Sequence, residues 1–147
     1  MSGQTRQPYL PGDLVGAAPD PLAAAFWTPG EHGELRLQRC TACGRFRHPP
    51  LLGCPGCGSP DTEWAPVSGR GTVFSYTIAT HPVSPQLADY CPYNVVLVEL
   101  EEAPDVRIIS NIVDTAPEEI AIGMPVILAW DRVSEEVSLP RFRRAES

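Results

Sequence analysis

The sequence contains no lysine, and all eleven of its basic residues are arginine. With 18 acidic residues, the formal net charge is −7. This balance argues against a nucleic-acid partner, because affinity for nucleic acid comes mainly from cations that neutralise phosphates. The charge is also uneven: residues 36–57 carry four arginines and no acid, whereas residues 84–136 carry eleven acids and two arginines. We therefore expect one basic and one acidic surface.

Long apolar runs are also missing. No stretch approaches the ~20 apolar residues of a membrane span, and residues 1–20 lack the continuous apolar core of a secretory signal. We therefore expect a soluble cytoplasmic protein without a membrane partner. Thiols stay reduced in the cytoplasm, so paired cysteines favour a metal over a disulfide.

Motifs of common catalytic sites are absent as well. The serines lie outside any nucleophile-elbow pattern, and the Gly-Arg-Gly-Thr stretch that starts at Gly69 lacks the lysine of a phosphate-binding loop. Cys91 has only His81 in its loop as a base, so we interpret this cysteine as a small, partly buried hydrophobe. We predict no catalytic residue.

The sequence contains short β-prone runs and shows no alternation of strands with helices. The predicted strands are residues 33–40, 71–80, 92–102, 106–114, 126–133 and 137–139. We expect residues 92–102 and 106–114 to be mostly buried, because they are nearly continuously apolar. Strands in this order favour a mainly β protein with a five-stranded oligomer-binding (OB) barrel. Phe74 and Tyr76 share one strand face, and we interpret them as barrel core rather than as a base-stacking pair, because the acid excess across the barrel half would repel a polyanionic strand.

Prolines and glycines divide the rest of the chain. Residues 1–19 predict an extended arm, and residues 20–30 predict a short helix with Asp20 as its N-cap and Pro29-Gly30 as its end. Residues 80–94 contain three prolines and predict a functional loop without regular structure. The expected divisions are an arm and helix (1–34), a metal ribbon (35–62), an OB barrel (63–142) and a tail (143–147).

Two Cys-x-x-Cys pairs provide the strongest local signal. Their members are Cys40, Cys43, Cys54 and Cys57. Each pair is followed by a glycine, Gly44 or Gly58, which can turn backbone N–H groups towards the sulfurs. Four thiolates predict a tetrahedral Zn²⁺ site, although iron can occupy the same ligands. Because four thiolates leave no open position, we expect a structural metal, with His48 exposed and outside the ligand set.

Three arginines are candidates for contact with an anion. Arg45, Arg47 and Arg70 could bind the phosphates of coenzyme A, or pair with Glu31, Glu34 and Glu63. We slightly favour the ion pairs.

The order of motifs resembles a known family over residues 20–142. The segments "GELRLQRCTACGRFRHPP", "CPGCGS", "EWAPVSGRGTVFSYT", "PYNVVLVELEE" and "IGMPVILAW" are similar to the acyl-CoA-associated proteins that join a rubredoxin-like zinc ribbon to an OB barrel. This family was long classified as a domain of unknown function.

The resemblance implies a non-catalytic accessory subunit that docks on a thiolase-fold partner and helps to guide a CoA thioester. The partner would make or cleave a carbon–carbon bond, with retro-aldol cleavage of a steroid side chain as one case. An autonomous acyl-CoA or small-ligand binder is the alternative, and a single-stranded nucleic-acid binder is a third possibility that the charge disfavours.

Overall fold

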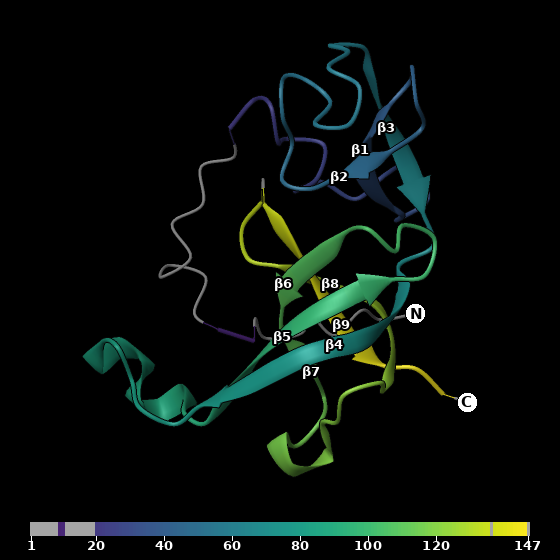
Figure 1. Ribbon diagram of the computed structural model, residues 1–147. Helices are drawn as coiled ribbons and strands as arrows, with labels where there is room; N and C mark the ends of the chain where they lie inside the picture. Colours follow the sequence, from purple (N-terminus) through teal and green to yellow (C-terminus); the bar gives the residue numbers. More distant parts are fainter. Residues whose placement is uncertain (1–8, 11–19, 136, 147) are drawn as a thin grey trace.

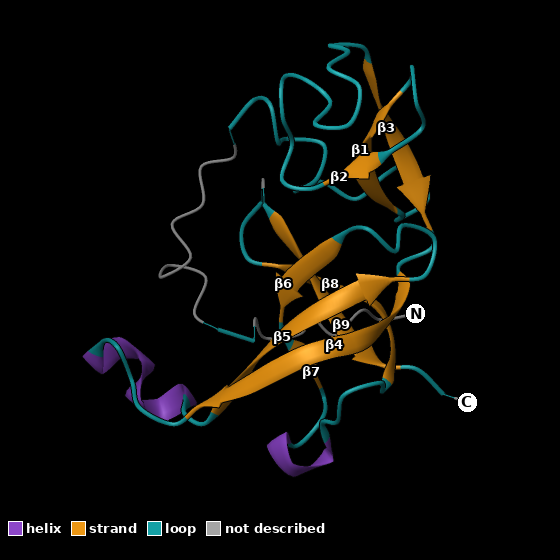
Figure 2. Cartoon of the chain, viewed as in Figure 1, coloured by secondary structure: helices purple, strands orange, loops and turns teal. Residues whose placement is uncertain are grey.

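The computed structural model describes residues 9–10, 20–135 and 137–146, and its strands form two sheets (Figure 1). The strands are β1 (Leu35–Cys40), β2 (Phe46–Arg47), β3 (Thr62–Val67), β4 (Arg70–Ala79), β5 (Tyr93–Leu100), β6 (Arg107–Ser110), β7 (Ile112–Val113), β8 (Pro125–Arg132) and β9 (Ser138–Arg144). Helix is limited, in these residues, to two short 3₁₀ segments, η1 (Pro85–Tyr90) and η2 (Pro117–Glu119) (Figure 2). Neither segment has the length and apolar character needed to cross a membrane. The mainly β class that the sequence predicts is confirmed.

The smaller sheet has the order β2-β1-β3, with both neighbours antiparallel to β1. Leu35 and Leu37 of β1 are fully buried, which is the pattern that the alternation of leucine with polar residues predicts. Cys40 ends β1 opposite Thr62, the first residue of β3. Because β3 runs on to Val67, this sheet extends beyond residue 62, the boundary expected for the ribbon.

The larger sheet closes into a barrel. Its order is β6-β5-β4-β8-β9-β7, and only Asn111 separates β6 from β7, so these two are halves of one bent strand. The first and last members of the sheet are therefore continuous, which gives five strands in a closed ring. β7 pairs with β9 in parallel, and the other described pairs are antiparallel. The predicted five-stranded OB barrel is confirmed.

A β-bulge in β4 changes which side chains face the core. The register with β5 shifts between Val73 and Ser75, so that Phe74 has no partner opposite it. The side chain of Val73 is buried, whereas 45% of Phe74 and 39% of Tyr76 is exposed. The interpretation of Phe74 and Tyr76 as core residues is wrong, because the bulge breaks the alternation on which it depended.

Burial along β5 and β6 also differs from the expectation. Residues of β5 alternate between buried and half-buried positions, and residues of β6 alternate between exposed and buried ones. The outward positions carry apolar side chains such as Ile109, which is 74% exposed. The prediction that both strands are mostly buried is therefore only half right.

One hydrophobic core joins the two sheets. Phe26, Leu35 and Leu37 from the ribbon side belong to the same buried cluster as Val98 and Phe142 of the barrel. Two hydrogen bonds add to this packing: the Trp130 Nε1–H donates to Gly33 O at 2.7 Å, and the Ser138 N–H donates to Trp27 O at 3.3 Å. The ribbon and the barrel are thus held against each other.

The predicted helix over residues 20–30 is instead a series of turns. The Ala23 N–H donates to Asp20 O at 2.8 Å and the Trp27 N–H donates to Ala24 O at 3.2 Å, both spanning three residues. Asp20 does cap the segment, since its Oδ1 accepts from the Leu22 N–H at 3.0 Å. Pro21 and Pro29 leave too few residues between them to repay the cost of nucleating an α-helix. The arm over residues 1–19 falls outside the described residues, apart from Tyr9 and Leu10.

The loop over residues 80–94 contains the short helix η1, so it is not without regular structure. Ser84 caps η1 by accepting from the Gln86 N–H, and Pro85 is its first residue. Cys91, just after η1, is half-buried, as the sequence predicted.

Candidate metal centre and ligand-binding residues

The two cysteine pairs form two matching turns. In each turn the glycine after the pair donates its N–H to the first cysteine's carbonyl at 2.8 Å, Gly44 to Cys40 and Gly58 to Cys54. Both glycines have a positive φ, 78° and 79°, which only glycine adopts without strain. The sequence therefore builds the same thiolate-presenting turn twice.

These turns bring the four sulfurs together. All four Sγ atoms lie within 4.8 Å of one another, and the Cys40–Cys57 and Cys43–Cys54 sulfurs are 3.6 Å apart. A tetrahedral ion with Zn–S bonds of ~2.3 Å requires sulfurs roughly 3.8 Å apart, so the geometry and the donor type both fit a thiolate-bound metal. Cys40 and Cys54 are buried, whereas Cys43 and Cys57 are exposed. The site thus lies at the surface with one side sealed by protein.

Backbone N–H groups favour the thiolate form of this cluster. Hydrogen bonds from the N–H groups of Cys57 and Gly56 lower the pKa of Cys54 to about 6, and the Cys43 N–H lowers the pKa of Cys40. The Ser59 N–H lowers the pKa of Cys57, but the neighbouring Cys40 sulfur and burial outweigh it and raise that pKa to about 11. Cys57 therefore retains a proton that a bound cation would displace.

His48 is half-buried against the core. Its ring lies 4.3 Å from the ring of Phe26, and burial lowers its pKa below the usual histidine value. The prediction of an exposed His48 is wrong, because Phe26, from the turn segment at residues 20–30, packs against its ring. The prediction that His48 is outside the candidate ligand set agrees with the four-cysteine cluster.

Arg45 and Arg47 line the same surface hollow of about 340 Å³, together with Asp105. Arg45 is exposed, whereas Arg47 is only 5% exposed. The Arg47 Nε donates to Gln38 Oε1 at 2.6 Å and its Nη2 donates to Leu51 O at 3.1 Å. Arg47 thus braces the loop between the cysteine pairs, and Arg45 is the one of the two that is open to an anion.

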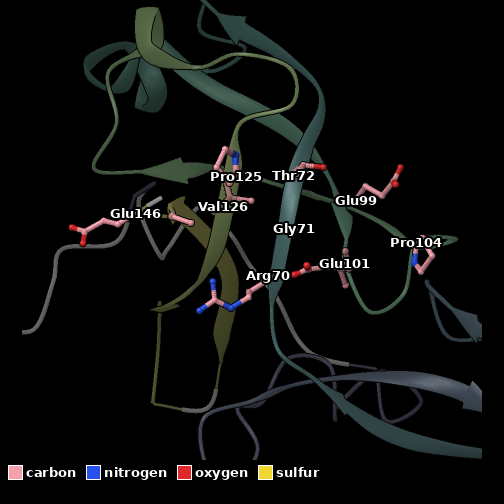
Figure 3. A pocket seen from close by; sticks show the side chains of 11 residues that line it. Arg70, Gly71, Thr72, Glu99, Glu101, Pro104, Pro125, Val126 and Glu146 are labelled. Carbon is pink, nitrogen blue, oxygen red and sulfur yellow. The ribbon is translucent and has the colours of Figure 1, made fainter.

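Arg70 lies in a different cavity, of about 420 Å³, at the start of β4. Figure 3 shows Arg70, Gly71 and Thr72 along β4, with Glu99 and Glu101 beside them. The structure therefore brings Arg45 and Arg47 together but leaves Arg70 apart from them. Gly71 allows β4 to lie close to β5, since a Cβ at this position would lie 2.4 Å from Glu99 O.

The ion pairs that we favoured for these arginines are not formed. Glu63 pairs with Arg39 at 3.3 Å, and the Glu34 carboxylate accepts from the His32 N–H at 2.9 Å. In the described part of the chain, no ion pair includes Arg45, Arg47 or Arg70. That interpretation is wrong, because β1 places Arg39 directly opposite Glu63.

A buried polar network inside the barrel was not foreseen. Asn94 is 1% exposed, and its side chain bonds both backbone groups of Ile112. Tyr9 Oη accepts from the Asn94 N–H and Nδ2 at 3.0 and 2.8 Å. Next to it, Arg141 bonds Asp131 and Asn111. The signal available in the sequence was an asparagine at the head of an apolar strand, but its partners are 18 and 85 residues away.

The fold and the four-cysteine cluster define a two-part protein, a rubredoxin-like ribbon joined to an OB barrel. Family models match both parts: residues 27–63 match "ChsH2, rubredoxin-like zinc ribbon domain" and residues 64–131 match "ChsH2, C-terminal OB-fold domain". A chain in the solved structure of an "Ltp2-ChsH2(DUF35) aldolase" is 42% identical, with a TM-score of 0.76, and the match covers 88% of this chain and 99% of that one. The chain therefore belongs to the ChsH2/DUF35 family, which confirms the resemblance drawn from the sequence.

Two curated relatives are named as subunits of hydratases. The chain is 46% identical over 122 residues to the "Probable enoyl-CoA hydratase alpha subunit" of Thermomonospora curvata, which is 82% of this chain and 37% of that protein. It is 40% identical over 103 residues to the "3-oxo-4,17-pregnadiene-20-carboxyl-CoA hydratase alpha subunit" of Mycobacterium tuberculosis, which is 70% of this chain and 32% of that protein. The chain thus spans about a third of the length of these two relatives.

Proposed function

We propose that this chain is an accessory subunit of a thiolase-like complex that makes or cleaves a carbon–carbon bond in an acyl-CoA thioester. The observation that carries the proposal is the 42% identity to a chain of an Ltp2-ChsH2(DUF35) aldolase, of which it covers 99%. In this assignment the thiolase-fold partner supplies the nucleophile and the base, and this chain docks on it. The complex is a hetero-oligomer.

The finer proposal is retro-aldol cleavage of a steroid side chain. The aldolase match and the pregnadiene-carboxyl-CoA hydratase relative support it. To test this substrate class, we would compare the kcat/KM of the assembled complex for a steroid CoA thioester with that for a straight-chain CoA thioester. Cleavage of the straight-chain thioester at an equal kcat/KM by the assembled complex would rule out the steroid assignment.

The ion in the four-cysteine cluster is zinc in this proposal, and its role is structural. The sulfur spacing and the all-thiolate donor set support a closed tetrahedral site, since a fourth protein ligand leaves no position for water or substrate. The cysteines hold the ion, and the ion in turn joins the turn at Cys40 to the turn at Cys54. Metal binding thereby becomes folding energy for the ribbon.

Arg45 is the residue that we propose for contact with a phosphate of CoA, with Arg47 beneath it as a positioning residue and Arg70 at a separate place. The exposed guanidinium of Arg45, free of an ion pair among the described residues, supports this assignment. We expect Arg45→Gln to raise KM for a CoA thioester about tenfold in the assembled complex. It should leave KM unchanged for the pantetheine thioester, which lacks the nucleotide phosphates. Arg132→Gln, at another exposed arginine, is the matched control.

Co-expression with a thiolase-fold protein tests the subunit assignment. We expect the two chains to elute together in size-exclusion chromatography, and the partner to lose activity when this chain is omitted. Cys43→Ser should prevent co-elution by unfolding the ribbon, whereas Cys91→Ser should not. Separate elution, with full partner activity alone, would contradict the proposal.

A further inference from the structure

A cavity of about 640 Å³ lies between the ribbon and the barrel. Phe26 and Trp27 line it from the ribbon side, and Ile109 and Leu139 line it from the barrel. Its volume falls within the ~300–1,000 Å³ of small-molecule sites, which are mostly apolar with a few polar groups that orient the ligand. The cavity does not include the cysteine cluster, and it adjoins the hollow of Arg45, with which it shares His48 and Pro49.

The charged groups that line this cavity are cationic. Arg107 and Arg141 lie on its wall, and no described lining residue is acidic, in a chain of net charge −7. The Arg107 guanidinium stacks 4.0 Å above the ring of Phe74, and its Nη2 lies 3.6 Å from Glu99. Arg107 is therefore held at the rim, where its charge is partly balanced.

Arg141 is held more deeply and is less well balanced. It is 7% exposed; its Nε lies 3.4 Å from Asp131 Oδ2, and its Nη1 donates to Asn111. The same Asp131 oxygen also accepts from the Tyr9 N–H at 3.0 Å, and the Arg141 Nη2 is buried without a hydrogen-bond partner among the described residues. Burial lowers the pKa of Arg141, with Asp131 opposing that effect. A buried cation with an unused donor is stabilised by a further acceptor.

We propose that this cavity binds an apolar carboxylate, with its hydrocarbon part against Trp27, Ile109 and Leu139 and its carboxylate beside Arg141, while Arg107 lies at the rim. The aromatic wall supplies affinity, because half-buried Trp27 packs edge to face on buried Phe26 at 5.0 Å and so presents a fixed apolar surface. The arginines supply selection for an anion over a neutral molecule of the same shape.

Calorimetry on the metal-loaded full chain tests the site with decanoate, and with decanol as the neutral probe of equal length. We expect decanoate to bind at one site per chain and at least about tenfold more tightly than decanol. No binding of decanoate, or equal affinity for the two probes, would overturn the proposal.

Two matched isoleucine variants locate the site. Ile109 at the cavity is 74% exposed and Ile122, outside the lining, is 70% exposed, so both tolerate a charged side chain. Ile109→Glu should weaken decanoate binding about tenfold or more by repulsion, whereas Ile122→Glu, with the same change in net charge, should leave it within about twofold. Equal weakening by both variants would refute the location. Since no partner is present in these measurements, their outcome is independent of co-elution with a thiolase-fold protein.

Discussion

The Asn94 side chain bonds both backbone groups of Ile112, accepting from its N–H at 2.6 Å and donating to its carbonyl at 2.8 Å. Asn94 lies in β5 and Ile112 in β7, where the bent strand has turned away from β5 to meet β9. The amide group therefore does what a backbone peptide would do in a regular ladder. It satisfies the backbone of Ile112 where the bend interrupts the pairing.

Removing this amide should destabilise the barrel strongly. We expect Asn94→Ala to lower the free energy of unfolding by about 3 kcal/mol, because it leaves both backbone groups of Ile112 buried without partners. Tyr9→Phe removes only the acceptor of two Asn94 donors and should cost about 1 kcal/mol. Urea unfolding followed by circular dichroism measures both. Equal losses for the two variants would contradict the bridging role of Asn94.

Metal content should depend on the paired cysteines. Cys43→Ser is expected to abolish stoichiometric zinc and to unfold the ribbon, because three thiolates hold the ion less tightly and the ribbon depends on it. Cys91→Ser, at the half-buried cysteine outside the cluster, should retain both metal and fold. Elemental analysis with thermal unfolding measures this. Normal zinc in purified Cys43→Ser protein would disprove the four-ligand assignment.

The free energy of unfolding should decrease on acidification, because His48 is protonated more readily in the unfolded chain than in the folded protein. Burial lowers its pKa in the folded protein, whereas in the unfolded chain the pKa is about 6.5. The unfolded state then binds more protons below that pH, so stability is complete above about pH 6.5 and decreases as the pH falls towards the folded pKa. His48→Gln should flatten this dependence between about pH 7.5 and 5.5. The exposed His81→Gln should not, and a wild-type slope in His48→Gln would show that other groups cause it.

Substitution by alanine should lower the free energy of unfolding by different amounts at two phenylalanines, Phe142 in the core and Phe74 at the bulge in β4. Phe142 is fully buried in the core, so Phe142→Ala should cost about 4 kcal/mol. Phe74→Ala should cost less than about 1 kcal/mol, since the side chain is 45% exposed and Arg107 stacks on its outer face. Denaturant unfolding compares the two. A loss above about 2 kcal/mol for Phe74→Ala would place that ring in the core after all.

Gly71 should not tolerate a side chain. Gly71→Ala would set its Cβ 2.4 Å from Glu99 O and 2.9 Å from Val98 Cγ1, so we expect a loss of about 2 kcal/mol as β4 and β5 separate. Gly53→Ala is the control, because its Cβ would meet nothing closer than 3.9 Å. The melting temperatures of the two variants provide the comparison. Equal melting temperatures would mean that the strands adjust without cost.

The features that the sequence predicted are local ones. Two turns of at most six residues each follow from the spacing of the four cysteines, Cys40, Cys43, Cys54 and Cys57. One strand follows from the alternation of apolar and polar residues around Leu35. The order of the β-prone runs then restricted the barrel to few topologies. These signals need no knowledge of distant neighbours.

The features that were missed depend on distant neighbours. Phe74 faces outward because β4 takes an extra residue relative to β5, and His48 is covered because Phe26 reaches it from another segment. The partner of Glu63 is decided by the register between β1 and β3. Periodicity within one strand carries no information about register or bulges, so these contacts could not be derived from it.

The parallel pairing of β7 with β9 has a consequence for synthesis on the ribosome. The ring is completed only when residues 138–144 have emerged, since β9 alone bridges β8 to β7. A nascent chain that stops before Ser138 would present two unpaired strand edges, and such edges recruit other chains. Premature termination at this point should therefore yield aggregates in place of a weakened monomer.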